Sequence, residues 1–387
     1  MEFFVNKKLG SISILVTSLL VAGLLQAAVL IPAAPQVSAK SYVLLDFETG
    51  TVLASQDVDR EVDPASITKM MTAYVVFTEL KSGVFKLEDM VTISEKAWRE
   101  PGSRMFIEVN TQVSVEDLIK GMVIQSGNDA SVALAEYTAG SEDGFATLMN
   151  QYAQELKLTH SHFTNATGLP AEGHYVSAHD MALLSVALIR DFPEYYPWFA
   201  EKEFTYNNIK QSNRNTLLWQ NQGVDGLKTG HTNDAGYCLV ASAVRGKQRL
   251  ISVVMGSSSE KARAADAMTM LGYGFRFFET HKLYDAGHEL ASTKVWKGTA
   301  DKLALGTVEP LVVTIPRGTY DALEADLEFP DQIIAPIEQG AVLGHASIRL
   351  DGKEIANIPV VALHGIEEGG LWKSMKDSVY LWFESDD

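Results

Sequence analysis

Three short motifs constrain this chain more than any other feature of its sequence, because their side chains complete one acyl-transfer site only if the fold brings them together. They occur in the order Ser66-Ile67-Thr68-Lys69, Ser126-Gly127-Asn128 and Lys228-Thr229-Gly230. Each pattern is weak alone, and Ser-x-x-Lys occurs again at Ser258, which is better explained as a helix N-cap. All three in this order predict a serine enzyme that needs no histidine.

The first motif predicts a nucleophile and its base. Serine attacks weakly unless a nearby base removes its proton. A lysine three residues later, in the first turn of a helix, lies on the same face as the serine. Ser66 is therefore the predicted nucleophile and Lys69 the predicted general base, with a helix cap and a solvated charge as the alternatives. The neighbouring Met70, Met71 and Tyr74 favour a partly buried segment, in which desolvation lowers the pKa of an amine.

The other two motifs predict proton transfer and substrate binding. Ser126 is expected to relay a proton to the departing amine, and Asn128 to hold a substrate amide. An ordinary turn between two helices is the alternative for this pair. Lys228 and Thr229 offer a cation and a hydroxyl to an anionic group of the substrate, and Gly230 is expected to let the substrate backbone approach closely.

The motifs and the runs around them resemble those of the penicillin-recognising serine enzymes, the penicillin-binding proteins and serine β-lactamases. The segments 63–72, 121–130 and 224–232 are similar to the low-molecular-mass D-alanyl-D-alanine carboxypeptidases, and the resemblance covers nearly the whole chain. It implies an α+β fold with a β-lactamase/transpeptidase-like domain. It also implies an oxyanion hole formed by the backbone N–H groups of Ser66 and His231. Arg214 resembles the family arginine that helps to bind the terminal carboxylate, although a surface cation is its alternative.

The resemblance implies removal of the terminal D-alanine from peptidoglycan pentapeptides through an acyl-enzyme on Ser66. Penicillin mimics the D-alanyl-D-alanine end, so β-lactams are expected to acylate the same serine. A β-lactamase is one alternative; Glu172 lies in a loop region but lacks the Glu-x-x-Leu-Asn pattern. A D,D-endopeptidase with the same chemistry and a wall-associated binding protein with an inactive cleft are the others. No cofactor is expected, and no histidine cluster indicates a metal site.

Hydrophobic patterning predicts how the chain is organised. Strands, then helices, then strands and a helix indicate helices packed on an antiparallel sheet over residues 40–282. Short alternating apolar runs separated by turns predict a small all-β domain over residues 283–365. The fold class is therefore α+β, followed by an all-β domain and a C-terminal amphipathic helix at residues 366–387.

Composition limits the partners. The chain has 387 residues, of which 46% are hydrophobic, enough for one large core and a second domain. It carries 32 basic and 49 acidic residues, a net charge of −17, without a basic cluster, which argues against a nucleic-acid partner. Cys238 is the single cysteine, so no intrachain disulfide can form and the compartment must be inferred from targeting signals.

The N-terminus has the order of a secretory signal peptide. Lys7 and Lys8 precede an apolar run from about Ile12 to Ile31, which small residues follow. Cleavage is expected after Ala39, which makes residues 1–39 the signal peptide. An uncleaved anchor is the alternative, because the run is long enough to span a membrane. Export would place the protein at the periplasmic face of the inner membrane.

The C-terminal stretch predicts an interfacial helix. Its large apolar side chains fall on one helical face: Leu371, Trp372, Met375, Val379, Trp382 and Phe383. A helix docked on its own domain is one interpretation. The favoured one is an anchor that lies on the membrane surface, with the tryptophans at headgroup level.

Overall fold

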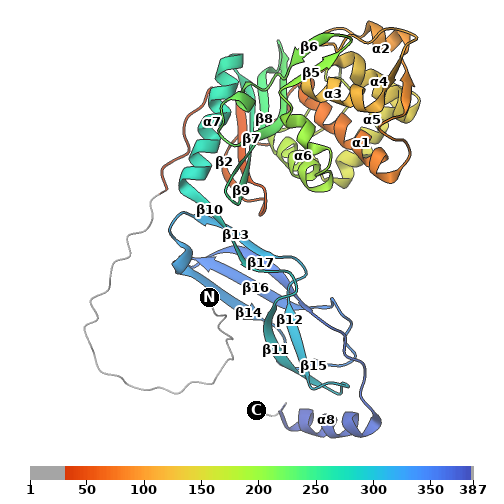
Figure 1. Ribbon diagram of the computed structural model, residues 1–387. Helices are drawn as coiled ribbons and strands as arrows, with labels where there is room; N and C mark the ends of the chain where they lie inside the picture. The colour runs from red at the N-terminus through yellow and green to blue at the C-terminus, as the bar shows by residue number, and fades with distance from the viewer. Residues whose placement is uncertain (1–30, 385–387) are drawn as a thin grey trace. The chain divides into compact units, whose positions relative to one another are not determined.

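The computed structural model describes residues 31–384, which form two compact units (Figure 1). The N-terminal unit runs from Pro32 to Phe277, and the C-terminal unit begins at Phe278. The boundary expected after residue 282 falls slightly earlier, because strand β10 (Phe278–Tyr284) pairs with β13 (Leu311–Pro316) of the second unit. Most of the apolar run interpreted as a signal peptide, up to residue 30, lies outside the described residues.

A five-stranded antiparallel sheet organises the N-terminal unit. Its spatial order is β2 (Val52–Gln56), β1 (Ser41–Asp46), β9 (Gln248–Ser257), β8 (Gly236–Arg245) and β7 (Val224–Thr232). Residues 238–243 and 250–255 are continuously buried, which requires that both faces of the central strands are covered. Helix α7 (Glu260–Phe277) packs on one face, and the other helices gather beyond the opposite face (Figure 1).

The helical cluster contains α1 (Lys69–Ser82), α2 (Glu95–Arg99), α3 (Val115–Ile124), α4 (Asn128–Ala139), α5 (Glu142–Glu155) and α6 (Ala178–Asp191). Four of these helices begin after a serine whose hydroxyl accepts a backbone N–H three residues later: Ser94, Ser114, Ser141 and Ser177. Strand β3 (Met90–Thr92) pairs with β4 (Gln112–Ser114) across a long connection that contains α2, and a short hairpin joins β5 (Glu203–Tyr206) to β6 (Ile209–Ser212). Three 3-10 turns complete the unit: η1 (Ala65–Thr68), η2 (Tyr196–Ala200) and η3 (Thr216–Trp219). The predicted α+β class, with helices on an antiparallel sheet, is confirmed.

The C-terminal unit is built almost entirely from strands, as the sequence predicts. A six-stranded sheet has the order β14 (Leu323–Glu328), β16 (Val342–Leu350), β17 (Lys353–Ala362), β12 (Lys302–Gly306), β11 (Glu289–Trp296) and β15 (Ile333–Ile334). Strands β10 and β13 form a separate pair, and a short 3-10 turn, η4 (Tyr320–Ala322), precedes β14. Alternating residues of these strands, among them Leu303, Leu305 and Val313, form a core of their own.

Helix α8 (Leu371–Glu384) ends the C-terminal unit (Figure 1). Its apolar face is exposed, from 56% of the residue surface at Val379 to 86% at Trp372. Its polar face is attached to the unit: the buried carboxylate of Asp377 accepts the backbone N–H of Lys297 at 2.7 Å, and Lys373 pairs with Asp301. Within residues 31–384, no helix combines the length and the apolar character needed to cross a bilayer.

The segment before β1 packs on helix α7. Ser38 donates to the carboxylate of Asp266 from its backbone N–H at 3.1 Å and from its hydroxyl at 2.7 Å. Ala39 is buried, and the Tyr273 hydroxyl donates to the carbonyl of Pro32 at 3.0 Å. Cleavage after Ala39 would therefore remove residues that are part of the folded unit.

Candidate active site

The first motif lies where η1 continues into α1. Ser66 is in the 3-10 turn, and Lys69 is the first residue of α1. The Lys69 Nζ atom lies 3.0 Å from Ser66 Oγ, 2.7 Å from Asn128 Oδ1 and 2.6 Å from the Thr167 carbonyl oxygen. The structure thus surrounds the amine with three polar partners, one of which is the predicted nucleophile.

Burial sets the protonation of Lys69. The side chain is completely inaccessible to solvent, and burial lowers the pKa of its amine from 10.5 to about 7. The negative charges of Glu100 and Asp129 act in the other direction and raise this pKa, but the effect of burial is larger. An amine with this pKa is half neutral near pH 7 and so has a lone pair that can accept a proton.

The second motif forms the turn between α3 and α4. Ser126 has a φ of 68°, a left-handed conformation that is uncommon for a residue with a side chain. Asn128 begins α4, and both its polar groups are engaged: Oδ1 accepts from Lys69, and Nδ2 donates to the Pro101 carbonyl at 2.6 Å. The next residue, Asp129, holds the loop at residues 105–107 against the start of α4, because its buried carboxylate accepts the backbone N–H groups of these three residues.

Strand β7 brings the third motif to the other two. The Lys228 Nζ atom lies 2.9 Å from Ser126 Oγ and 3.1 Å from the Thr229 carbonyl oxygen. Burial holds the pKa of Lys228 well below its ordinary value, and the positive charges of Lys69, Arg214 and Arg263 lower it further. A lysine in this state readily gives up a proton, and Ser126 is its immediate partner.

The absence of a side chain at Gly230 has a structural consequence besides the close approach of substrate expected from the sequence. A Cβ atom at this position would lie 3.1 Å from the Pro64 carbonyl oxygen and 3.2 Å from Ile67 Cγ1. The missing side chain therefore lets β7 approach η1, which brings Lys228 and Ser66 to one site. The neighbouring His231 is exposed, and its ring stacks on that of Tyr237 with centroids 4.0 Å apart.

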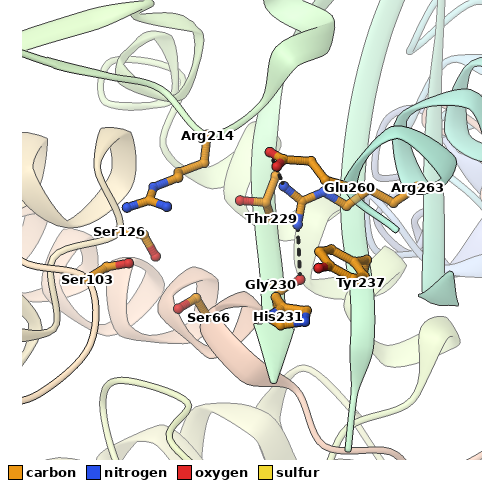
Figure 2. A pocket seen from close by; sticks show the side chains of 10 residues that line it. All are labelled: Ser66, Ser103, Ser126, Arg214, Thr229, Gly230, His231, Tyr237, Glu260 and Arg263. Carbon is orange, nitrogen blue, oxygen red and sulfur yellow. Dashed lines mark hydrogen bonds and ion pairs between the residues drawn. The ribbon is translucent and has the colours of Figure 1, made fainter. Parts of the chain in front are cut away.

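One cavity of about 250 Å³ joins the three motifs (Figure 2). It is lined by Ser66, Ser103, Ser126, Arg214, Thr229, Gly230, His231, Tyr237, Glu260 and Arg263. Six of the nine predicted site residues are thus at its surface. The other three, Lys69, Asn128 and Lys228, are buried and hydrogen-bonded to one another or to Ser66 and Ser126. Glu172, weighed for a β-lactamase, is exposed and does not line the cavity.

Two arginines give this cavity its positive charge. Arg214 extends into it toward Ser126 (Figure 2), and within residues 31–384 no carboxylate pairs with it. Arg263 enters from α7, where it donates to the Gly230 carbonyl at 3.3 Å and pairs with Glu260 at 3.1 Å. The sequence shows Arg263 only as one charge in a helix, so its place at the site could not be predicted. Arg214 is the cation that a bound anion would meet unpaired.

A second group that the sequence did not reveal is the turn at residues 165–169. It supplies the Thr167 carbonyl to Lys69, and a backbone carbonyl has no sequence signature. His174 lies next to it: its Nδ1 accepts the Thr164 N–H, so Nε2 carries the proton toward the Thr68 hydroxyl at 2.9 Å. Burial lowers the pKa of His174 to about 4, so this histidine is neutral and structural.

Among residues 31–384, no three His, Cys, Asp or Glu side chains come together as metal ligands, and Cys238 is buried. The chemistry that the geometry supports comes from two serine–lysine pairs, Ser66 with Lys69 and Ser126 with Lys228, around one cationic cavity.

Comparison with known proteins places both units. The profile of a family described as D-alanyl-D-alanine carboxypeptidase matches residues 28–259, and that of the penicillin-binding protein 5 C-terminal domain matches residues 278–368. The chain is 47% identical over 362 residues to D-alanyl-D-alanine carboxypeptidase DacA of Escherichia coli, which covers 92% of this chain and 90% of that protein.

Solved structures give the same result. Penicillin-binding protein 5 from Haemophilus influenzae is similar with a TM-score of 0.85 at 43% identity, covering 87% of this chain and 100% of that one. Penicillin-binding protein D2 from Listeria monocytogenes, solved in its ampicillin-bound form, is similar with a TM-score of 0.58 at 30% identity, covering 62% of this chain and 98% of that one.

Proposed function

This chain belongs to the D-alanyl-D-alanine carboxypeptidase family and is a serine-type hydrolase of that family, and we propose that its Ser66 attacks the carbonyl between the two D-alanine residues of a peptidoglycan pentapeptide. The terminal D-alanine leaves, and water then releases the shortened peptide from Ser66. The observation that carries the assignment is the 3.0 Å approach of Ser66 Oγ to a buried lysine amine whose pKa is about 7.

Lys69 acts as the general base of this reaction. A neutral amine has two N–H groups and one lone pair. Because Asn128 Oδ1 and the Thr167 carbonyl accept the two N–H groups, the lone pair faces Ser66 Oγ and takes its proton as the Oγ–carbon bond forms. Asn128 keeps a second Nδ2 hydrogen that can bind a substrate amide carbonyl, its expected role.

Ser126 and Lys228 serve the departing amine. The carbon–nitrogen bond breaks as Ser126 gives its proton to the leaving nitrogen. Lys228 then returns a proton to Ser126 across their 2.9 Å contact. The lowered pKa of Lys228 supports this role, because the ammonium loses its proton more easily than a solvated lysine does.

The positive end of the cavity holds the terminal carboxylate of the substrate. Arg214 and Thr229 line the cavity and offer it a cation and a hydroxyl, and the buried Lys228 amine lies next to them, on Ser126 and the Thr229 carbonyl. The backbone N–H groups of Ser66 and His231 stabilise the oxyanion that develops on the attacked carbonyl. Penicillin presents a carboxylate and a reactive carbonyl in a similar relation, so β-lactams acylate Ser66 and block the site, in line with the ampicillin-bound Listeria relative.

Export and membrane attachment complete the proposal. The signal-like N-terminus directs the protein to the periplasmic face of the inner membrane, and the packing of Ser38 and Ala39 on the folded unit favours cleavage upstream of Ser38 over cleavage after Ala39. The exposed apolar face of α8 binds the membrane surface. Asp377 holds the opposite face of the helix on the C-terminal unit, so the apolar side chains remain exposed on the other face.

The test is release of D-alanine. The purified protein is incubated with a peptide that ends in D-alanyl-D-alanine, and free D-alanine is measured with and without prior treatment with benzylpenicillin. We expect release that penicillin abolishes and that Ser66→Ala lacks. Release by the Ser66→Ala variant at the wild-type rate would refute the mechanism.

A further inference from the structure

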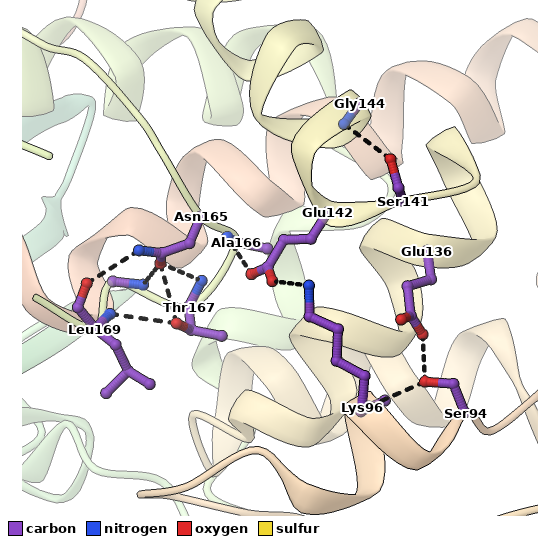
Figure 3. Close-up of polar contacts among 12 residues, drawn as sticks. Ser94, Lys96, Glu136, Ser141, Glu142, Gly144, Asn165, Ala166, Thr167 and Leu169 are labelled. Atoms are coloured by element: carbon purple, nitrogen blue, oxygen red, sulfur yellow. Dashed lines mark hydrogen bonds and ion pairs between the residues drawn. The ribbon is translucent and has the colours of Figure 1, made fainter. Parts of the chain in front are cut away.

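One side chain, that of Asn165, fixes the shape of the turn at residues 165–169, which supplies the Thr167 carbonyl to Lys69. Asn165 Oδ1 accepts the backbone N–H groups of Thr167 at 3.1 Å and Gly168 at 2.7 Å, and Asn165 Nδ2 donates to the Leu169 carbonyl at 3.0 Å (Figure 3). Gly168 lies against η1 so closely that a Cβ atom there would be 1.7 Å from the Ala65 carbonyl oxygen. The Thr167 carbonyl therefore moves with the whole turn.

Two side chains from neighbouring helices attach this turn at Ala166. The Thr72 hydroxyl donates to the Ala166 carbonyl at 2.8 Å, and Glu142 Oε1 accepts the Ala166 N–H at 3.1 Å. The other carboxylate oxygen of Glu142 lies 2.7 Å from the Lys96 amine, so the carboxylate bridges α2 and the turn (Figure 3). Glu142 is nearly buried, with 11% of its side chain exposed, which makes its hydrogen bonds worth more than those of a surface pair.

We propose that Glu142 is a positioning residue for Lys69: by accepting the Ala166 N–H it keeps the Thr167 carbonyl on the lysine amine, while Lys96 holds the Glu142 carboxylate in place. The inference rests on the proposed role of Lys69 as the base. Glu142 does not line the cavity, so it acts on the chemical step through the turn and not through the substrate.

The consequence follows from the geometry of a neutral amine. With only Asn128 Oδ1 left as a fixed acceptor, the amine can rotate about the Cε–Nζ bond, and its lone pair no longer points at Ser66 Oγ for most of the time. Small misplacements of a catalytic group cost up to about 10²-fold in rate. Loss of Glu142 should therefore slow acylation and leave the noncovalent binding of penicillin unchanged.

Two matched variants distinguish the effect of the hydrogen-bond acceptor at position 142 from the effect of its negative charge. Glu142→Gln removes the charge but keeps a carbonyl oxygen for the Ala166 N–H, whereas Glu142→Met fills a similar volume and accepts nothing. We expect the acylation rate constant with fluorescent penicillin to fall roughly 10- to 100-fold in Glu142→Met and to stay within about threefold in Glu142→Gln. The dissociation constant of the noncovalent complex should not change in either. Equal acylation by the two variants would overturn the inference.

A charge swap gives the decisive control. In Lys96→Glu/Glu142→Lys the ion pair is restored in reverse, but an ammonium at position 142 cannot accept the Ala166 N–H. We expect this double variant to have a thermal unfolding midpoint closer to that of the wild type than Glu142→Met has. Its acylation by fluorescent penicillin should nevertheless remain slow. Recovery of both would mean that the pair only stabilises the fold, and the positioning role would be wrong.

The pH dependence of acylation adds a readout that folding stability does not affect. The charged groups that face Lys69 are Glu100, Asp129 and Lys228, and all variants keep them. Because Glu142→Gln and Glu142→Met remove the same charge, a difference between their pH profiles reports the lost acceptor. If Lys69→Met acylates normally, the proposed base is wrong; if Lys69→Met is slow but Glu142→Met is fast, the positioning role alone fails.

Discussion

Replacing Lys69 by methionine tests two properties of its amine: its role as the general base and its effect on the free energy of unfolding. The variant keeps the volume of the side chain and removes the amine that lies 3.0 Å from Ser66 Oγ. General-base assistance contributes about 10²- to 10⁴-fold, so acylation by penicillin should fall at least by that range. Two buried acceptors, Asn128 Oδ1 and the Thr167 carbonyl, lose their partner, which costs about 1–3 kcal/mol for each at any pH.

The stability of the wild type relative to this variant depends on pH in a defined direction. The pKa of Lys69 is lowered from 10.5 to about 7 in the folded protein, so between these values the unfolded chain binds a proton that the folded chain does not. The free energy of unfolding of the wild type therefore rises with pH across this window. At about 1.4 kcal/mol per pKa unit, the wild type should gain roughly 2 kcal/mol over Lys69→Met between pH 7 and about pH 9.

Urea denaturation of both proteins at the two pH values measures this gain, and labelling by fluorescent penicillin measures acylation. The variant lacks only the one titrating amine, so the difference between the two curves isolates its proton. A constant difference at both pH values would show that Lys69 has an ordinary pKa in the folded protein. An acylation loss below about tenfold would assign the base to another group.

Three further changes test other parts of the account. Lys228→Glu should slow both D-alanine release and penicillin acylation, because each ligand brings a carboxylate to this charge; an effect on one alone would contradict a shared carboxylate site. Asp129→Ala should lower the free energy of unfolding by about 3–5 kcal/mol in urea melts, because it removes the acceptor of several buried N–H groups; a loss below about 1 kcal/mol would mean that these groups find other partners. Deletion from Gly369 onward should keep the enzyme active but abolish its sedimentation with lipid vesicles, and a truncated protein that still sediments would place the attachment elsewhere.

The parts of the site that could be predicted from the sequence are those in which short-range geometry carries the information. A serine and a lysine three residues apart meet on one helical turn, so Ser66 and Lys69 could be paired without a structure. The same reasoning predicts the exposed face of α8 from its spacing.

What could not be predicted depends on backbone atoms and on contacts between distant segments. The Thr167 carbonyl and the Ala166 N–H are backbone groups that do not depend on the side chain, so no sequence pattern reveals them. Arg263 is indistinguishable from other helix charges until α7 packs beside β7. The sequence does not reveal that Gly230 also lets β7 approach η1, because η1 is distant in the chain.

The identity of the acylated residue tests the central claim most directly. The protein is incubated with benzylpenicillin, digested, and its peptides are compared by mass spectrometry with those of Ser66→Ala treated in the same way. The account predicts one added penicilloyl group, on the peptide that contains Ser66, at a rate that falls as pH drops below about 7 because Lys69 becomes protonated. An adduct on Ser126 or any other residue, or an adduct that persists in Ser66→Ala, would contradict it.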